Sequence, residues 1–274
     1  VYGGTLTDKP GSDAFRAVVL DGTAAARPIW MVYGHVDPVL GFVAEGLVQG
    51  EGVTTQITTS LNSFVSSNAL EFSNLLRATA LTHEAGHQVA HIAGWNAELA
   101  AVLAEGLLQE GGSTVDLSQT WSGWASEIAA DCFAFVHTGY ASVVGLHDVL
   151  ATEAPSAFRL ISGDPHPVSY LRVLFGVQLC RHAWGDGPWD DLGRAWRALH
   201  PLELASTGIR ELVRDSLPRL ALIVRLCLDH PMQCFGGRSL RTMVSTDRVG
   251  PAALRGMAAR LGPALFTSAH WLWS

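Results

Sequence analysis

Long stretches rich in alanine and leucine fill the chain from about residue 68 onward and restrict most of it to a helical fold. Apolar residues recur in these stretches at the three- and four-residue spacing of amphipathic helices. Glycine, proline and aspartate cluster between them, which is typical of turns. The pattern predicts helices over roughly the following ranges: 68–93, 96–109, 119–136, 167–184, 189–199, 203–227 and 250–261.

The first 60 residues carry a different pattern. Short segments there are rich in β-branched and aromatic residues and are bounded by turn-forming residues, which favours three or four strands. They lie at 14–20, 29–33, 40–48 and 53–59. We therefore expect an α+β, mainly α fold, with a small N-terminal sheet in residues 1–60 and a helical body in residues 61–274. Because no repeat or flexible linker interrupts the chain, residues 1–274 are predicted to form one domain.

Composition and charge narrow the range of functions. The 274 residues are 48% hydrophobic and 16% charged, with a net charge of −7, which excludes intrinsic disorder and disfavours a nucleic-acid partner. No apolar run approaches the roughly 18 residues that span a bilayer, and no signal peptide is recognisable, so we expect a cytoplasmic protein. The four cysteines form no CxxC pair and are expected to be reduced.

The sequence His-Glu-Ala-Gly-His at residues 83–87 is the strongest chemical signal in the chain. On a helix, His83 and His87 lie on one face, one turn apart, so that both imidazoles can bind one Zn²⁺ ion. Glu84 is rotated by about 100° from His83, where its carboxylate can accept a proton from a zinc-bound water. The alternative is a chance match in an ordinary helix.

A catalytic zinc ion needs a third protein ligand and one open position. The metzincin pattern would place a histidine at residue 93, which is Ala93. Glu127 and Asp131 lie four residues apart on a predicted helix, so one carboxylate can bind the metal while the other orients a ligand histidine. Two acids on an otherwise apolar helix are costly to bury without a cation, which favours a metal ion nearby. The alternative is that both acids lie on a solvent-exposed face. We interpret His91 as a rim or core histidine.

The segment that begins at His166 is the third informative stretch. Proline is favoured at the first helical position, so Pro167 places His166 at the N-cap, where its ring would face a developing oxyanion. Arg172 follows six residues later, and helical spacing alone does not aim both side chains at one point. A plain capping turn and a structural ion pair are the alternatives for these two residues.

Together, these three segments resemble the gluzincin metallopeptidases related to HtpX and the CAAX prenyl protease. The family pattern is HExxH, then ExxAD on a later helix, then HPxxxxR, and here it matches residues 83–87, 127–131 and 166–172 in order. The resemblance covers about 90 residues and implies a zincin-like fold built around an HExxH active-site helix. The sequence departs from those relatives at Ala85, where leucine is frequent in the family. It also lacks their membrane spans, so their substrate class does not carry over.

The resemblance also implies a role for each matching residue. Three residues would bind the zinc ion: His83, His87 and Glu127. Four more would support or perform the chemistry: Glu84 as the base, Asp131 behind a ligand histidine, and His166 and Arg172 at the scissile carbonyl or its oxyanion.

The sequence thus predicts a zinc metalloendopeptidase that hydrolyses a peptide or protein substrate. One alternative is a non-catalytic module with a zincin fold, whose protein partner would contact the apolar C-terminal region at 217–228 and 266–274. Another is a metal-dependent hydrolase of non-peptide amides. The natural substrate, the oligomeric state and the role of residues 1–60 as sheet, prosegment or lid stay open.

Overall fold

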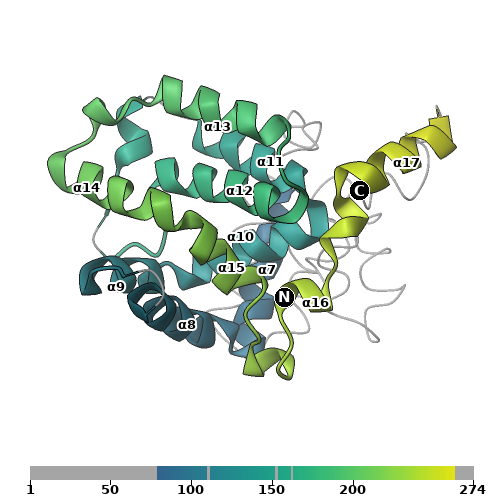
Figure 1. Cartoon of the computed structure of the whole chain (residues 1–274), viewed down its shortest axis with the longest axis horizontal. Helices are drawn as coiled ribbons and strands as arrows, with labels where there is room; N and C mark the ends of the chain where they lie inside the picture. The colour runs from purple at the N-terminus through teal and green to yellow at the C-terminus, as the bar shows by residue number, and fades with distance from the viewer. Residues whose placement is uncertain (1–78, 110–111, 152–153, 162, 263–274) are drawn as a thin grey trace, which may run out of the picture.

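The computed structural model describes residues 79–109, 112–151, 154–161 and 163–262 (Figure 1). Most of these residues lie in helices. The α-helices are α7 (Thr79–Ala93), α8 (Trp95–Gln109), α9 (Val115–Gly123), α10 (Ala125–Thr138), α11 (Tyr140–Leu150), α12 (Ser169–Trp184), α13 (Pro188–Leu199), α14 (Thr207–Ser216), α15 (Leu220–Leu228), α16 (Leu240–Met243) and α17 (Pro251–Leu261). Five short 3₁₀ helices link them: η2 (Ala154–Phe158), η3 (Leu202–Leu204), η4 (Leu217–Arg219), η5 (Gln233–Phe235) and η6 (Thr246–Val249).

The prediction of a mainly helical chain is confirmed, but the prediction of an α+β, zincin-like fold with a small sheet is wrong for the described residues. No strand occurs in the ranges given above, where β-type pairing is limited to one bridge between Met232 and Arg238. The strands expected within residues 1–60 lie outside the described residues. Helices instead bury one another's apolar faces, since α10 packs against α7, α8, α11, α12 and α15.

The helix boundaries differ from the predicted ones where a residue interrupts the backbone pattern. The predicted helix 119–136 is two helices, because the chain turns at Trp124 between α9 and α10. The predicted helix 203–227 is likewise divided by η4, which contains Pro218, a residue that has no N–H to donate. Helix α11 was not predicted. It begins directly after Gly139, whose φ of 64° ends α10 in a conformation that glycine adopts readily.

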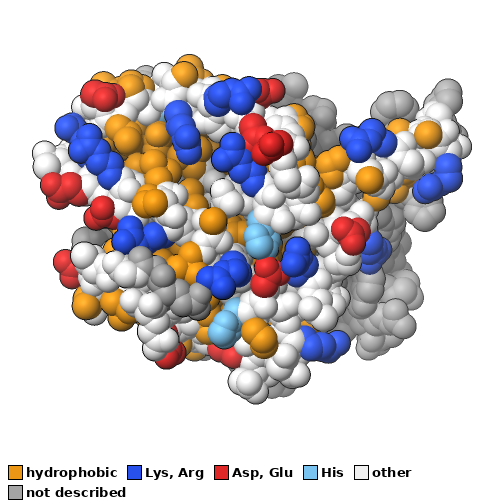
Figure 2. All heavy atoms as spheres, in the orientation of Figure 1, with side chains coloured by type: hydrophobic (Ala, Val, Ile, Leu, Met, Phe, Trp, Pro, Cys, Tyr) orange, Lys and Arg blue, Asp and Glu red, His pale blue; other side chains and the backbone are white. Residues whose placement is uncertain are grey.

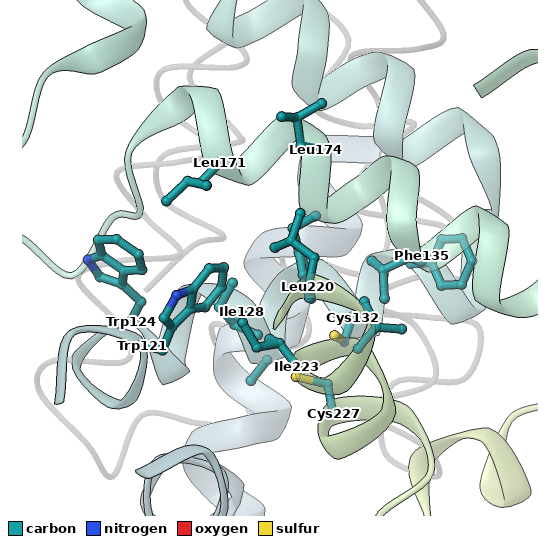
Figure 3. Close-up of a cluster of buried hydrophobic side chains, with 14 of the residues drawn as sticks. Trp121, Trp124, Ile128, Cys132, Phe135, Leu171, Leu174, Leu220, Ile223 and Cys227 are labelled. Atoms are coloured by element: carbon teal, nitrogen blue, oxygen red, sulfur yellow. The ribbon is translucent and has the colours of Figure 1, made fainter. Parts of the chain in front are cut away.

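A large apolar core lies where α9, α10, α12 and α15 meet (Figure 3). Trp121 is fully buried there, and its indole N–H donates to Ser216 Oγ at 3.1 Å, so its one polar atom is satisfied. Cys132 and Cys227 are also buried in this core (Figure 3), and all four cysteines are free thiols. None of the described helices is long and apolar enough to cross a bilayer.

The apolar segment at 217–228, one candidate for a partner surface, lies mostly in this core. Six residues of α15 are buried there: Leu220, Ile223, Val224, Leu226, Cys227 and Leu228. Figure 2 shows apolar side chains over the face where α12, α13 and α14 lie, among arginine side chains. Leu199 and Leu204, at the end of α13 and in η3, are exposed. The segment 266–274 lies outside the described residues.

Candidate metal centre

Helices α7 and α10 approach each other closely enough to bring the two halves of the predicted site together. A Cβ atom at Gly86 would lie 2.8 Å from Ala130 Cα, which is closer than real Cβ contacts, and 3.0 Å from Phe133 Cβ, which is unusually tight. Glycine in the HExxH motif therefore permits backbone contact between the helices, although it costs up to about 1 kcal/mol in helix propensity. This contact sets α7 directly against the acidic residues of α10.

The acidic residues of α10 face α7 and are buried. Glu127 is 4% exposed and Asp131 is 8% exposed. His83 Nδ1 lies 2.9 Å from Asp131 Oδ1, while its other ring nitrogen, Nε2, lies 3.4 Å from Glu127 Oε2. His87 Nε2 lies 3.2 Å from Glu127 Oε1. Asp131 thus contacts the back of the His83 ring and Glu127 faces the front of both rings, which is the arrangement predicted from the spacing of the two acids.

The distances between these donor atoms fit a single metal ion. His83 Nε2 and His87 Nε2 are 3.1 Å apart, and the donor atoms of His83, His87 and Glu127 all lie within 4.8 Å of one another. Tetrahedral zinc with bonds of ~2.0–2.1 Å places its ligand atoms about 3.3 Å apart. The three residues are therefore close enough to bind a metal ion.

The hydrogen bonding of the three candidate ligands also favours a cation between them. Glu127 Oε2 is buried without an aligned hydrogen-bond donor, although Arg172 Nη2 lies 2.8 Å away. The two facing imidazole nitrogens of His83 and His87 can form a hydrogen bond only if one of them is protonated. A metal ion would engage both nitrogens and the carboxylate together, so the donor set fits the predicted group.

Arg172 on α12 partly balances the charge of the two acids. It is 5% exposed, and its guanidinium donates through Nε to Asp131 Oδ2 at 2.7 Å and through Nη2 to Asp131 Oδ1 at 2.9 Å. Nη2 also lies 3.4 Å from His83 Nε2. Arg172 therefore connects the aspartate, the glutamate and a candidate ligand histidine, and it holds them in one arrangement.

Burial and neighbouring charges act against each other on the pKa values of His83, Glu127 and Asp131, and the charges have the larger effect. Burial alone would lower the pKa of His83, but the carboxylates of Asp131 and Glu127 outweigh it and raise the pKa to about 9. Burial alone would raise the pKa of Glu127, but hydrogen bonds from His83 and His87 and the charge of Arg172 hold it far below its usual range. Arg172 and His83 likewise keep the pKa of Asp131 low against its burial. Without metal, the site holds a proton that metal binding must release.

His166 lies at the open side of the group. Its side chain is 57% exposed, and its Nε2 lies 3.4 Å from Glu127 Oε1. Its Nδ1 lies 2.5 Å from Asp164 Oδ1, which also accepts a hydrogen bond from the His166 backbone N–H at 3.0 Å. Asp164 therefore orients the ring so that Nε2 points toward the candidate ligands.

Glu84 is half-buried and lines the same pocket as His83, Asp131, His166 and Arg172. The pocket has a volume of about 260 Å³. It lies between α7, α10, α11 and α12, so the predicted base and the predicted oxyanion residues share one cavity with one of the candidate ligands, His83.

The sequence prediction missed two residues that contact the site. Ser126 Oγ lies 3.2 Å from His87 Nδ1, and Asp164 holds His166. Ser126 precedes the candidate ligand Glu127, and Asp164 lies two residues before His166. An oxygen-bearing side chain beside a predicted site residue was therefore the available signal. His91 is exposed on α7 and is not part of the group.

The described fold is helical, and its polar centre is a candidate mononuclear metal site with two histidines and one glutamate. Comparisons with protein-family models, with curated proteins and with solved structures find no match. The chemistry of the site is therefore argued from its own geometry.

Proposed function

We propose that the protein is a zinc-dependent metallopeptidase of the gluzincin type, in which His83, His87 and Glu127 hold the metal. The observation that carries this proposal is the convergence of their donor atoms within 4.8 Å, with Glu84 lining the adjoining pocket. Nitrogen and carboxylate donors suit zinc, and the same set also binds ferrous iron in other proteins. Elemental analysis of the purified protein distinguishes the two ions.

The bound ion would supply Lewis acidity, which polarises a carbonyl group and makes water more acidic. Glu84 would act as the base, taking a proton from the attacking water and passing it to the leaving amine. This role is supported by its position one residue after a ligand, on the same helix and in the same pocket.

His166 and Arg172 would have different roles. His166, oriented by Asp164 and exposed toward the pocket, would donate a hydrogen bond to the developing oxyanion, an effect worth about 3 kcal/mol. Arg172 is committed to Asp131 and lies 2.8 Å from Glu127 Oε2, so it would act as a positioning residue that keeps the carboxylates in place.

Replacing the base tests the catalytic assignment. Glu84→Gln should keep metal binding and reduce peptide cleavage by about 100-fold or more. The same change at Glu105, an exposed residue of α8, is the matched control and should leave both properties unchanged. Cleavage of a fluorescence-quenched peptide library and metal content would be measured together, and retained turnover in Glu84→Gln would refute the assignment.

Removing the carboxylate ligand tests the metal site. Glu127→Ala should lower metal content after dialysis, whereas Glu211→Ala on the exposed face of α14 should not. Unchanged metal content in Glu127→Ala would refute the ligand assignment. Stoichiometric metal in the native chain without cleavage of any peptide would instead favour a non-catalytic module, and cleavage confined to small amides would favour a non-peptide hydrolase.

A further inference from the structure

We infer that the pocket beside the metal centre receives a large apolar side chain, aromatic or long aliphatic, of the substrate. This inference rests on the proposed function, because it assigns the pocket to the residue next to the cleaved bond. It adds a substrate class, which neither the sequence motifs nor the metal ligands specify.

The pocket has a polar end and an apolar end. The charged and imidazole side chains among the described lining residues all lie at the polar end: His83, Glu84, Asp131, His166 and Arg172. The remainder is formed mainly by aliphatic and aromatic side chains of α11 and α12: Val143, Leu146, Val149, Leu150, Phe175 and Leu179. A substrate bound at the metal centre can therefore extend one side chain into an apolar chamber.

The volume suits a large side chain. A cavity of roughly 150 Å³ lined by aliphatic and aromatic side chains accommodates benzene, and this pocket has about 260 Å³. A glycine or alanine side chain would leave most of this space unfilled and would forfeit the gain from apolar burial. A charged side chain would lose its hydration without meeting a partner among the described lining residues of the apolar end.

Helices α11 and α12 pack closely where they form the pocket wall. A Cβ atom at Gly176 would lie 2.9 Å from Val143 Cγ1, so the two helices meet at van der Waals contact there. Val143 is 3% exposed and both residues line the pocket. Leu146 lines the pocket one turn from this contact, so a change of its side chain alters the size of the chamber.

Amino-acid hydroxamates test the pocket separately from catalysis, because the hydroxamate group binds a metal ion whatever its side chain. The zinc-loaded full chain would be titrated by calorimetry with the hydroxamates of glycine, glutamate, leucine, phenylalanine and tryptophan. We expect phenylalanine and leucine hydroxamates to bind at least about tenfold more tightly than glycine hydroxamate, and glutamate hydroxamate no more tightly than glycine hydroxamate.

Variants at Leu146 locate the effect. Leu146→Phe should reduce the affinity for phenylalanine hydroxamate by at least about tenfold, and Leu146→Ala should shift the preference toward tryptophan hydroxamate. Val144, half-buried on the same helix and outside the described pocket lining, gives the matched controls Val144→Phe and Val144→Ala, which should keep the native order.

The outcomes separate the two proposals. Equal affinities across the series, or no binding by any member, would overturn the pocket while leaving the metal ligands to be judged by metal content. Graded affinities that follow side-chain size and respond to Leu146, without cleavage of any peptide, would support the pocket and refute the peptidase.

Discussion

Helix α10 contributes to two regions of opposite character. Toward α7 it presents Glu127 and Asp131, which are buried with histidines and an arginine. Toward α8 and α15 it contributes Ile128 and Cys132, and both lie fully buried in the apolar core (Figure 3). The same backbone therefore supports a charged cluster and an apolar interior that are less than one helical turn apart.

The difference lies in how each region offsets the cost of burial. The core needs only the removal of apolar surface from water, worth roughly 25 cal/mol per Å². The candidate metal centre needs opposite charges, because buried carboxylates without cations are strongly destabilising. Arg172 on α12 supplies one such charge, while Leu171 and Leu174 on the same helix belong to the core.

The largest effect is expected from removing that charge. Arg172→Met should destabilise the metal-free protein by about 3–5 kcal/mol at pH 8, because Glu127 and Asp131 lose a fully charged buried partner and keep only the protonated His83. Urea denaturation would measure the free energy of unfolding. At pH 5 the loss should be smaller, because the freed carboxylates can then take up protons. Equal losses at both pH values would contradict this account.

A core variant on the same helix should behave differently. Leu174→Ala removes a side chain that is 2% exposed and should cost about 2–5 kcal/mol. Since no charge changes, the loss should be the same at pH 5 and pH 8. Zinc affinity of the folded protein, measured by competition with a chelator, should stay within about twofold; a large fall would indicate that the two regions are coupled.

A smaller effect is expected from separating α7 from α10. Gly86→Ala places a methyl group against Ala130 and should cost about 1–3 kcal/mol while weakening metal binding. Gly208→Ala is the matched control, because nothing lies within 4 Å of a Cβ atom there in the exposed start of α14. It should be neutral or stabilise by up to about 1 kcal/mol. Thermal unfolding and metal titration of both variants would test the contrast.

The smallest effect near neutral pH comes from two half-buried histidines whose pKa values are shifted in opposite directions. His83, with a pKa raised to about 9, stabilises the metal-free fold fully below its unfolded pKa of 6.5 and loses this contribution as pH rises through 9. His137 has a pKa lowered to about 4 by burial and by Arg248, so the unfolded chain takes up its proton first and stability falls as pH drops from 6.5 toward 4.

The Tm of the metal-free protein should therefore be highest near pH 6.5 and change by a few degrees over the first pH unit on either side. Asp131→Asn should weaken the alkaline decline, and His137→Phe should weaken the acid decline, each without altering the other. A variant that weakens the acid and the alkaline decline of Tm equally would contradict the assignment of each decline to one histidine.

Much of the metal site could be predicted from local sequence. The spacing of His83 and His87 on a helix, and of Glu127 and Asp131 on another, identified the group whose donor atoms converge. Pro167 indicated a helix soon after His166, but the prediction of His166 as its N-cap is wrong, because α12 begins at Ser169 with Val168 as the N-cap. That the ion is zinc and that Glu84 is a base remain predictions.

The less predictable features depend on contacts between distant segments. Helix α11 follows directly after Gly139, and its residues 140–150 include several β-branched or aromatic side chains, which obscured the helical period. The role of Arg172 could not be predicted from its distance to His166 along the chain, because its partner Asp131 is 41 residues away on α10. The apolar pocket likewise needs α10, α11 and α12 side by side.

Residue order alone dictated which side chains share a helical face, because the 3.6-residue period is a local property of the backbone. That period was enough to identify the two helical faces that carry the candidate ligands, with Asp131 behind His83. Packing decided whether the faces meet: Gly86 against Ala130 lets α7 and α10 touch, and Arg172 reaches in from α12 to balance their charge. Such contacts join residues far apart in the chain, so only the folded arrangement of the helices could establish them.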